Sequence, residues 1–392
     1  MLLLALTLAC RPPASAPAEV PEVRFRPSPE PPTALAEVLV SRVPGSTWDR
    51  GLAHAAGLLL AAARDPADRI TPQATAAALD VAGYPGQARF AKEFNAGAFP
   101  EDLAAQLAAA ALERRWPVDV ALVKRNFGDG TTLWIGAVSP RPALLDPMPR
   151  AVPMDELVPV RVEMAAAPPL VLFVAPPDGP VRALPISAER AMWVDGFHVP
   201  GAYRLEVVSA PEGRPQDAQV LLLWSLFVDD EPEPPARLPQ ASLALPNPIA
   251  AADGLYARLD ALREGAGLKP VARFPDFEPL AREHAAFMAS TGNVAHALPG
   301  LTEGVAARAN RRFHPESIFY EDVAAAMSAE EALALVELSP GHRRHLLCEP
   351  CTHVSIGAAL EPVTDRAPRL FVTWELLEFP NGPPKAIESW DR

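Results

Sequence analysis

Forty-seven prolines among 392 residues constrain this chain more than any other feature of its sequence. Proline lacks a backbone N–H and clashes inside helices and central strands, so most of these residues must lie in linkers, loops and first helical turns. Two proline-rich stretches, 10–45 and 229–246, are therefore predicted to be linkers. A chain of this length is expected to hold two or three domains between them.

The first residues have the pattern of a secretory signal. MLLLALTLAC is an apolar run that ends in Cys10, and Thr7 to Cys10 resembles the bacterial lipobox, whose cysteine becomes lipid-modified. We therefore expect a signal peptide at 1–9, an exported protein of the cell envelope, and a membrane anchor at Cys10. Arg11 replaces the acidic residue that retains some lipoproteins at the inner membrane, which favours the outer membrane. An ordinary apolar N-terminus of a cytosolic protein is the alternative.

The net charge of the chain and the absence of common catalytic motifs argue against several classes of function. The net charge of −13 argues against nucleic acid as a partner. The three cysteines are too few for a small fold held together by disulfides. The sequence has no serine nucleophile elbow, His-Glu-x-x-His, P-loop or dinucleotide fingerprint.

Residues 46–145 predict a small α+β unit. Helical periodicity extends to Arg115, and strands are expected at 118–124 and 131–138, on either side of a Gly-Asp-Gly turn. The order of helices followed by a hairpin returns near the C-terminus, and the sequence leaves open whether the two units are related.

Residues 146–228 predict a β-sandwich. Short runs rich in valine and leucine recur, and the alternation in 200–207 resembles a late strand of an immunoglobulin-like domain. This segment has no motif for chemistry, and we expect His198 to be a structural or surface residue.

Residues 247–381 predict helices followed by two strands, before a tail at 382–392. Apolar spacing gives a helix over Ile249–Glu264, Ser328 begins a later helix, and strands are expected at 354–359 and 370–376. Six of the eight histidines lie in this segment. Because histidine is the commonest metal ligand and titrates near neutrality, this clustering suggests a functional site.

Five motifs follow one another in this segment: the opening Ala257–Arg263, Ala295-His296, Tyr320-Glu321-Asp322-Val323, Ser339-Pro340-Gly341-His342-Arg343 and Thr352-His353-Val354-Ser355-Ile356-Gly357. In kind and order they resemble the motifs of bacterial CAP domains, the SCP-like family of cysteine-rich secretory and pathogenesis-related proteins. Tyr320 and Val336 depart from the family's usual residues.

The resemblance implies an α+β multidomain protein that ends in a CAP α-β-α sandwich. It also implies a ligand cleft lined by His296, Glu321, His342 and His353, in which His342 stands on a turn. Two imidazoles and one carboxylate could hold Zn²⁺ with an open position. We expect His284 to be a hydrogen-bonded core residue, and His314 and His345 to be exposed.

The pair Cys348 and Cys351 has several interpretations. Its spacing to His342, His345 and His353 permits a soft-metal site, and a C-x-x-C can be redox-active. Because an exported protein lies in an oxidising compartment, we predict a local structural disulfide.

Three functions remain open for the cleft. The first is binding of a lipid-like small molecule, an envelope glycan or an envelope protein. The second is metal-dependent hydrolysis by His296, His353 and Glu321 with a bound water. The third is an envelope scaffold with a decayed cleft, which the departures at Tyr320 and Val336 suggest.

Overall fold

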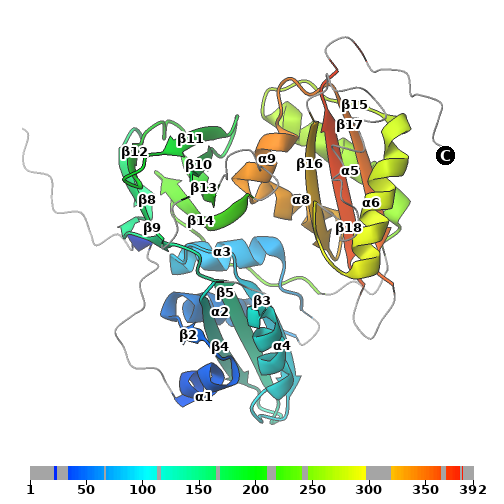
Figure 1. Cartoon of the computed structure of the whole chain (residues 1–392). Coiled ribbons are helices and arrows are strands. Elements are labelled where there is room, and N and C mark those ends of the chain that lie inside the picture. The colour runs from blue at the N-terminus through cyan, green and yellow to red at the C-terminus, as the bar shows by residue number, and fades with distance from the viewer. Residues whose placement is uncertain are drawn as a thin grey trace, which may run out of the picture.

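The computed structural model describes residues 22–23, 34–65, 68–112, 116–164, 168–209, 218–240, 246–296, 319–362, 368–379 and 382. These residues form three units that lie against one another (Figure 1). The predicted signal peptide, Cys10, His314 and all of the tail except Gly382 lie outside the described residues. None of the helices in the described part is both long and apolar enough to cross a membrane.

The first unit is a four-stranded sheet with helices on both faces. Its strand order is β2 (Ser46–Trp48), β4 (Val118–Asn126), β5 (Thr132–Pro140) and β3 (Arg89–Asn95). β2 is parallel to β4, and the other pairs are antiparallel. α2 (Arg50–Ala62) packs on one face and α3 (Pro72–Ala82) lies against α2, while α1 (Ala34–Arg42) and α4 (Glu101–Leu112) pack on the other face.

This unit begins earlier than residue 46. Leu39 and Val43 are fully buried in its core. The prediction that 10–45 is a linker is therefore wrong for its last part, because α1 supplies apolar side chains that the sheet needs for cover. Further upstream, β1 (Glu22–Val23) pairs with β7 (Met148–Pro149).

The second unit consists of two sheets. The larger has the order β11 (Arg182–Ile186), β10 (Leu170–Ala175), β13 (Gly201–Ser209), β14 (Gln219–Val228) and β8 (Ala151–Val152). The smaller has the order β12 (Ala191–Val194), β9 (Val158–Glu163) and β6 (Leu144–Leu145). Side chains of β9 alternate between buried and exposed, as expected for a strand with one face in a core. Apolar residues of both sheets join one core.

The acidic linker 229–246 is partly docked rather than free. Leu238 is 2% exposed, and its N–H donates to the carbonyl of Ala62. The N–H of Arg69 donates to the carbonyl of Pro239. The linker therefore runs back along the first unit before the third unit begins.

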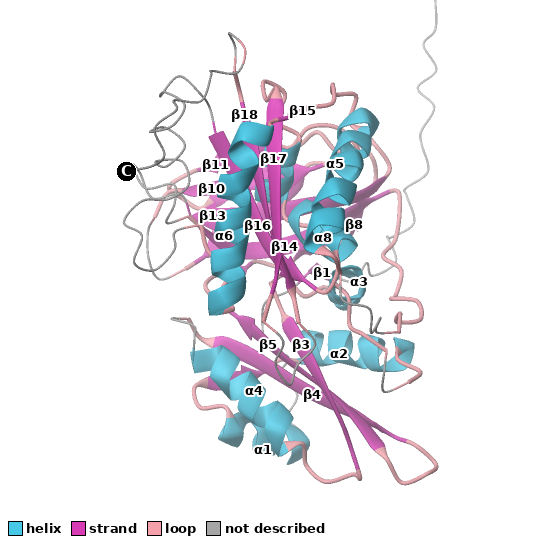
Figure 2. Cartoon of the chain, turned by 90° about the vertical axis from the view of Figure 1, so that its right-hand side faces the viewer, coloured by secondary structure: helices cyan, strands magenta, loops and turns pink. Residues whose placement is uncertain are grey.

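The third unit is an α-β-α sandwich. Its sheet has the order β15 (Ala272–Arg273), β17 (His353–Leu360), β18 (Leu370–Leu377) and β16 (Phe319–Ala326). α6 (Glu278–Thr291) follows the 3-10 turn η2 (Pro275–Phe277) and covers one face. α5 (Pro248–Gly265) and α8 (Ala329–Glu337) cover the other face (Figure 2). In the sequence α9 (Pro340–Leu346) follows α8.

The expected helices and strands of this unit agree with the structure to within one residue where they were predicted. β16 was not predicted from the sequence, because its residues lack a clear alternation of polar and apolar side chains. The motif Tyr320–Val323 lies within this edge strand of the sheet.

The first and third units share one topology. In each, the first strand is parallel to the third, and the sheet order is first, third, fourth, second. A buried tryptophan marks the equivalent place in the fourth strand: Trp134 lies opposite Glu93, and Trp374 lies opposite Asp322.

The first unit lacks the acidic residues that the third unit carries at the equivalent positions. In the third unit Glu321 and Glu375 are directly opposite each other on neighbouring strands. The equivalent pair in the first unit is Lys92 and Ile135. The first unit therefore has the scaffold without the acidic pair.

Candidate functional site

The site is built around β16, the edge strand of the third unit's sheet. Successive side chains of a strand point to opposite faces, so Glu321 faces α6 and Asp322 faces the other side. Asp322 is fully buried, and 9% of the Glu321 side chain is exposed. Two adjacent carboxylates therefore reach histidines on both faces of one strand.

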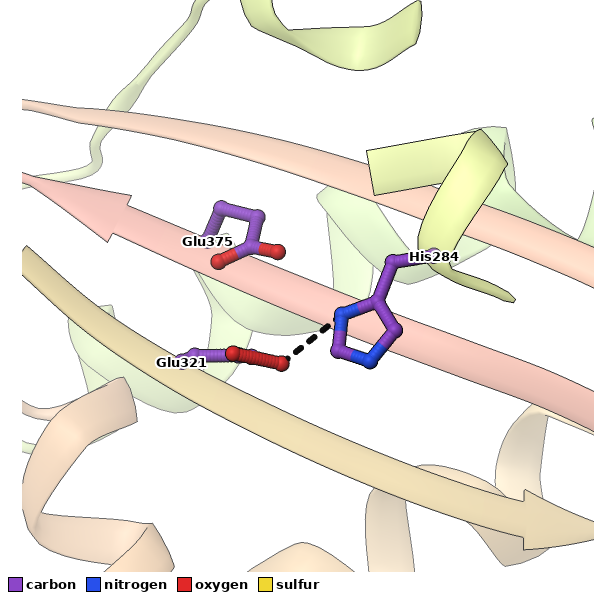
Figure 3. Close-up of side chains that lie close together, drawn as sticks. All are labelled: His284, Glu321 and Glu375. Atoms are coloured by element: carbon purple, nitrogen blue, oxygen red, sulfur yellow. Dashed lines mark ion pairs between the residues drawn. The ribbon is translucent and has the colours of Figure 1, made fainter. Parts of the chain in front are cut away.

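On the α6 face, Glu321 meets His284. The His284 ring is fully buried, and its Nδ1 lies 2.8 Å from Glu321 Oε1 (Figure 3). Its Nε2 lies 2.9 Å from the carbonyl oxygen of Ala295. Glu375 lies beside them on β18, directly opposite Glu321. The expectation that His284 is a core residue is met, but it also contacts the acidic centre of the site.

His296 lies at the open side of the same carboxylate. Its Nδ1 is 3.7 Å from Glu321 Oε1, and 44% of its side chain is exposed. Burial alone would lower the pKa of His296, but the nearby carboxylate of Glu321 outweighs it, and the pKa is raised. Burial raises the pKa of Glu321, yet His284 and His296 together hold it below its usual range.

α9 brings two further histidines to the other face. Ser339 caps this helix: its hydroxyl accepts from the His342 N–H and lies 2.9 Å from His342 Nδ1. His345 Nδ1 is 2.8 Å from Asp322 Oδ1, and its ring stacks on Tyr320 at 4.8 Å between centroids. His345, expected to be exposed, is therefore a partner of the buried carboxylate.

The two faces meet around the edge of β16. The rings of His296 and His342 are stacked with centroids 6.4 Å apart. The pKa of His342 is lowered, mainly because the ring is buried. The neighbouring His345 and His296 lower this pKa further, and Asp322 only partly offsets the decrease. The pKa values of His296 and His342 thus move in opposite directions, so that near neutral pH one imidazole is biased toward the charged donor and the other toward the neutral acceptor.

The second unit holds the helix that carries His342. Glu206 of β13 is fully buried and accepts from Ser339 Oγ at 2.9 Å and from the Gly341 N–H at 2.5 Å. Arg343 donates to the carbonyl of Pro176 in the same unit. The cleft therefore depends on the contact between two units.

The structure does not bring His353 to this cluster. His353 begins β17, with its ring against Phe274 and Phe379 and its Nδ1 2.9 Å from Thr352 Oγ1. The strand β18 separates it from β16. The expected grouping of His353 with His296 and Glu321, and with it the expected zinc ligand set, is therefore corrected, whereas His342 does lie beside His296.

The sequence contained signals for the residues that were missed. Glu375 is the one charged side chain in the apolar run Leu370–Leu377, where burial of an acid requires a reason. His284 likewise interrupts the apolar face of α6. Glu206, in the otherwise apolar end of β13, had the same character.

In the structure Cys348 and Cys351 are joined by a disulfide, with Cα atoms 5.4 Å apart. A disulfide leaves no thiolate for a soft-metal site at these positions. Arg263, which is 1% exposed, supports the same loop: its Nη1 donates to the carbonyls of Leu346 and Cys348 at 2.8 and 3.0 Å.

Removing this disulfide should lower stability moderately. The Cys348→Ser/Cys351→Ser variant is predicted to lose about 2 kcal/mol of unfolding free energy, because the bridge closes only a very short loop. Chemical denaturation with and without a reductant measures the loss. An unchanged midpoint in both comparisons would show that the Arg263 contacts alone hold the loop.

A comparison of the sequence with family profiles matches the "Cysteine-rich secretory protein family", CAP, over residues 256–373. This match covers β16, α6, α8, α9 and most of the sheet described above.

The C-terminal third of the chain is a CAP domain.

Three solved structures have some similarity to the chain. They include an outer surface protein of Borrelia burgdorferi, with 19% identity, a TM-score of 0.30, and coverage of 34% of this chain and 96% of that one. An extracellular protein with an SCP domain from Bacillus anthracis has 16% identity, a TM-score of 0.29, and coverage of 58% and 66%. A cysteine-rich secretory protein from Staphylococcus aureus has 14% identity, a TM-score of 0.26, and coverage of 47% and 57%. No curated protein sequence matches the chain.

Proposed function

We propose that this protein is exported to the bacterial cell envelope, anchored at Cys10, and that the cleft of its CAP domain binds a ligand rich in hydrogen-bonding groups. The observation that carries the proposal is the facing pair of His296 and His342, whose pKa values move apart. A charged donor next to a neutral acceptor suits a hydroxyl or amide that both accepts and donates. Among the ligands considered from the sequence, an envelope glycan or protein fits this chemistry better than a lipid chain.

The second unit supports this assignment because it holds α9 in place. Glu206 accepts hydrogen bonds from Ser339 Oγ and the Gly341 N–H at the start of α9. Arg343 of the same helix donates to the carbonyl of Pro176. A helix held at both its start and its side keeps His342 in one position, which reduces the entropy lost when a ligand binds. We infer that the second unit, predicted to be immunoglobulin-like, serves as a brace for the cleft.

Binding to soluble peptidoglycan fragments tests the glycan assignment. We expect the full chain to bind them in a calorimetric titration and the His296→Gln/His342→Gln variant to bind about 100-fold more weakly, since each lost hydrogen bond corresponds to roughly tenfold. His353→Gln, which changes a histidine outside the cleft, is the matched control and should bind as the native chain does. Equal binding by the double variant, or capture of phospholipid vesicles in place of the fragments, contradicts the proposal.

Anchoring has its own test. The native chain, expressed in a bacterium with an outer membrane, is expected in the membrane fraction, and Cys10→Ser is expected to move it to the soluble fraction. A soluble native chain, or a variant that stays with the membrane, would show that Cys10 is not the anchor.

Hydrolysis remains a second candidate because of the same pKa separation. Two titratable groups whose environments push their pKa values apart are suited to act as acid and base. In that case, hydrolysis of an amide or ester substrate should follow a bell-shaped pH profile with limbs set by His296 and His342. A rate in either single glutamine variant equal to that of the native chain would exclude this role.

A further inference from the structure

Three metal-ligand side chains meet beneath α6, behind the open side of the cleft. His284 comes from α6, Glu321 from β16 and Glu375 from β18 (Figure 3). Each offers one nitrogen or oxygen atom, and these atoms all lie within 4.8 Å of one another. His284 and Glu375 are fully buried.

The sheet itself imposes this arrangement. Glu321 and Glu375 are directly opposite each other on antiparallel strands, so their side chains leave the same face of the sheet at neighbouring positions. Ala281 of α6 rests on this face, because its carbonyl accepts from Thr373 Oγ1 at 3.0 Å. His284, one turn further along α6, is thereby placed over the acidic pair.

The two carboxylates of this group lie close together, and Glu375 is fully buried. Carboxylates this close repel each other, and keeping them out of water is costly unless cations or protons accompany them. A cation bound between Glu321 and Glu375 would relieve that repulsion.

The hydrogen bonding of His284 leaves its Nδ1 directed at the acidic pair, where a metal ion could bind. A neutral imidazole has one N–H, and His284 places Nε2 at the carbonyl of Ala295 at 2.9 Å. Its Nδ1 lone pair is then directed at Glu321 Oε1, and neither of these two buried atoms has a hydrogen bond of acceptable geometry. Ligating histidines in metalloproteins typically donate their other N–H to a carbonyl in this way.

We propose that His284, Glu321 and Glu375 bind one divalent metal ion of the zinc type in the interior of the CAP domain. One imidazole and two carboxylates suit zinc and related first-row ions, whereas calcium and magnesium prefer ligand sets made of oxygen alone. Bond lengths of about 2.0–2.2 Å place zinc ligands roughly 3.3–3.6 Å apart, so the three side chains need only small inward movements. This set shares only Glu321 with the zinc ligands expected from the sequence.

The site is separate from the proposed ligand cleft and connected to it. His296 contacts Glu321 from the solvent side and is not one of the three ligands. A metal ion below Glu321 fixes the carboxylate that orients His296. The inference does not depend on which ligand the cleft binds.

Metal content tests the proposal directly. The full chain, purified without chelators and equilibrated with zinc, is expected to hold one equivalent by mass spectrometry of its metals, and cobalt in its place should give the visible absorption of a four-coordinate ion. Glu375→Gln, which keeps the side-chain shape, is expected to weaken zinc affinity more than about 100-fold, the upper limit for losing an outer-shell partner. His353→Gln is the control and should retain the metal.

A second measurement covers the case in which Glu375→Gln does not fold. Zinc should raise the thermal midpoint of the native chain, and a chelator should lower it. A native chain that binds no zinc and shows no shift, or a folded Glu375→Gln variant that binds zinc like His353→Gln, would overturn the proposal and assign the buried charge to a shared proton.

Discussion

Gly357→Ala is expected to destabilise the CAP domain by about 3 kcal/mol, the upper end of the usual cost of overpacking a core. Gly357 lies in β17 beneath α6, and a Cβ atom there would fall deep inside the van der Waals radii of the Ala281 carbonyl group and the Arg282 nitrogen. These are backbone atoms, so a side-chain rotation cannot relieve the clash. The whole helix must move away from the sheet.

That movement should also affect the site, because α6 carries His284. We expect denaturant unfolding of Gly357→Ala to show a lower midpoint, together with weaker ligand binding. Gly254→Ala is the matched control: Gly254 lies in α5 with open space around it, and alanine there should add about 1 kcal/mol through helix propensity. Equal stability of the two variants would mean that α6 does not lie this close to β17.

The second large effect is a pH dependence centred on Glu206. The pKa of Glu206 is raised to about 7, mainly because the carboxyl group is buried. Asp322 raises this pKa further, whereas the hydrogen bonds from the Gly341 N–H and the Ser339 hydroxyl and the charge of His345 lower it. The unfolded chain has a pKa near 4.5 at this residue. The folded state therefore holds a proton that the unfolded state has already lost, and its stability decreases as pH rises between these two values.

The Glu206→Gln variant isolates this contribution. At 1.36 kcal/mol per pKa unit, the native chain should lose on the order of 3 kcal/mol between pH 4.5 and 7.5 through Glu206, and the variant should not. Glutamine resembles the protonated acid in shape, so the two proteins are expected to be similar near pH 4.5. The test is the difference in unfolding free energy between the native chain and Glu206→Gln, measured from pH 4.5 to pH 7.5. A constant difference, or a native chain that gains relative stability with rising pH, contradicts the assignment.

Local sequence signals predicted α5, α8 and two strands of the CAP domain, whereas the segment that forms α9 was expected as a turn. Asn247 and Ser328 cap α5 and α8 with side-chain hydrogen bonds, and the positions of such caps depend on few neighbours. The edge strand β16 was missed because its small residues acquire strand character only by pairing with β18. The docking of Leu238 on the first unit likewise depends on contacts between distant segments.

The site was predicted in part. His296 and Glu321 stand in motifs that resemble those of the family, and the structure places them together. His353 was assigned to the cleft from a motif at the start of β17, but the register of the sheet puts it beside Phe274. His284 and Glu375 carry no motif, and their meeting follows from helix placement and strand register, which no local pattern contains.

The central claim is that His296 and His342 together form the binding cleft of this CAP domain. Nitrogen NMR of the imidazole rings tests it most directly, because each histidine reports its own protonation and its own response to peptidoglycan fragments. We predict that His296 titrates above and His342 below the ordinary histidine value, and that both respond to the fragments while His353 does not. Equal titration of the two rings, or a response at His353 without one at His296 and His342, would contradict the account.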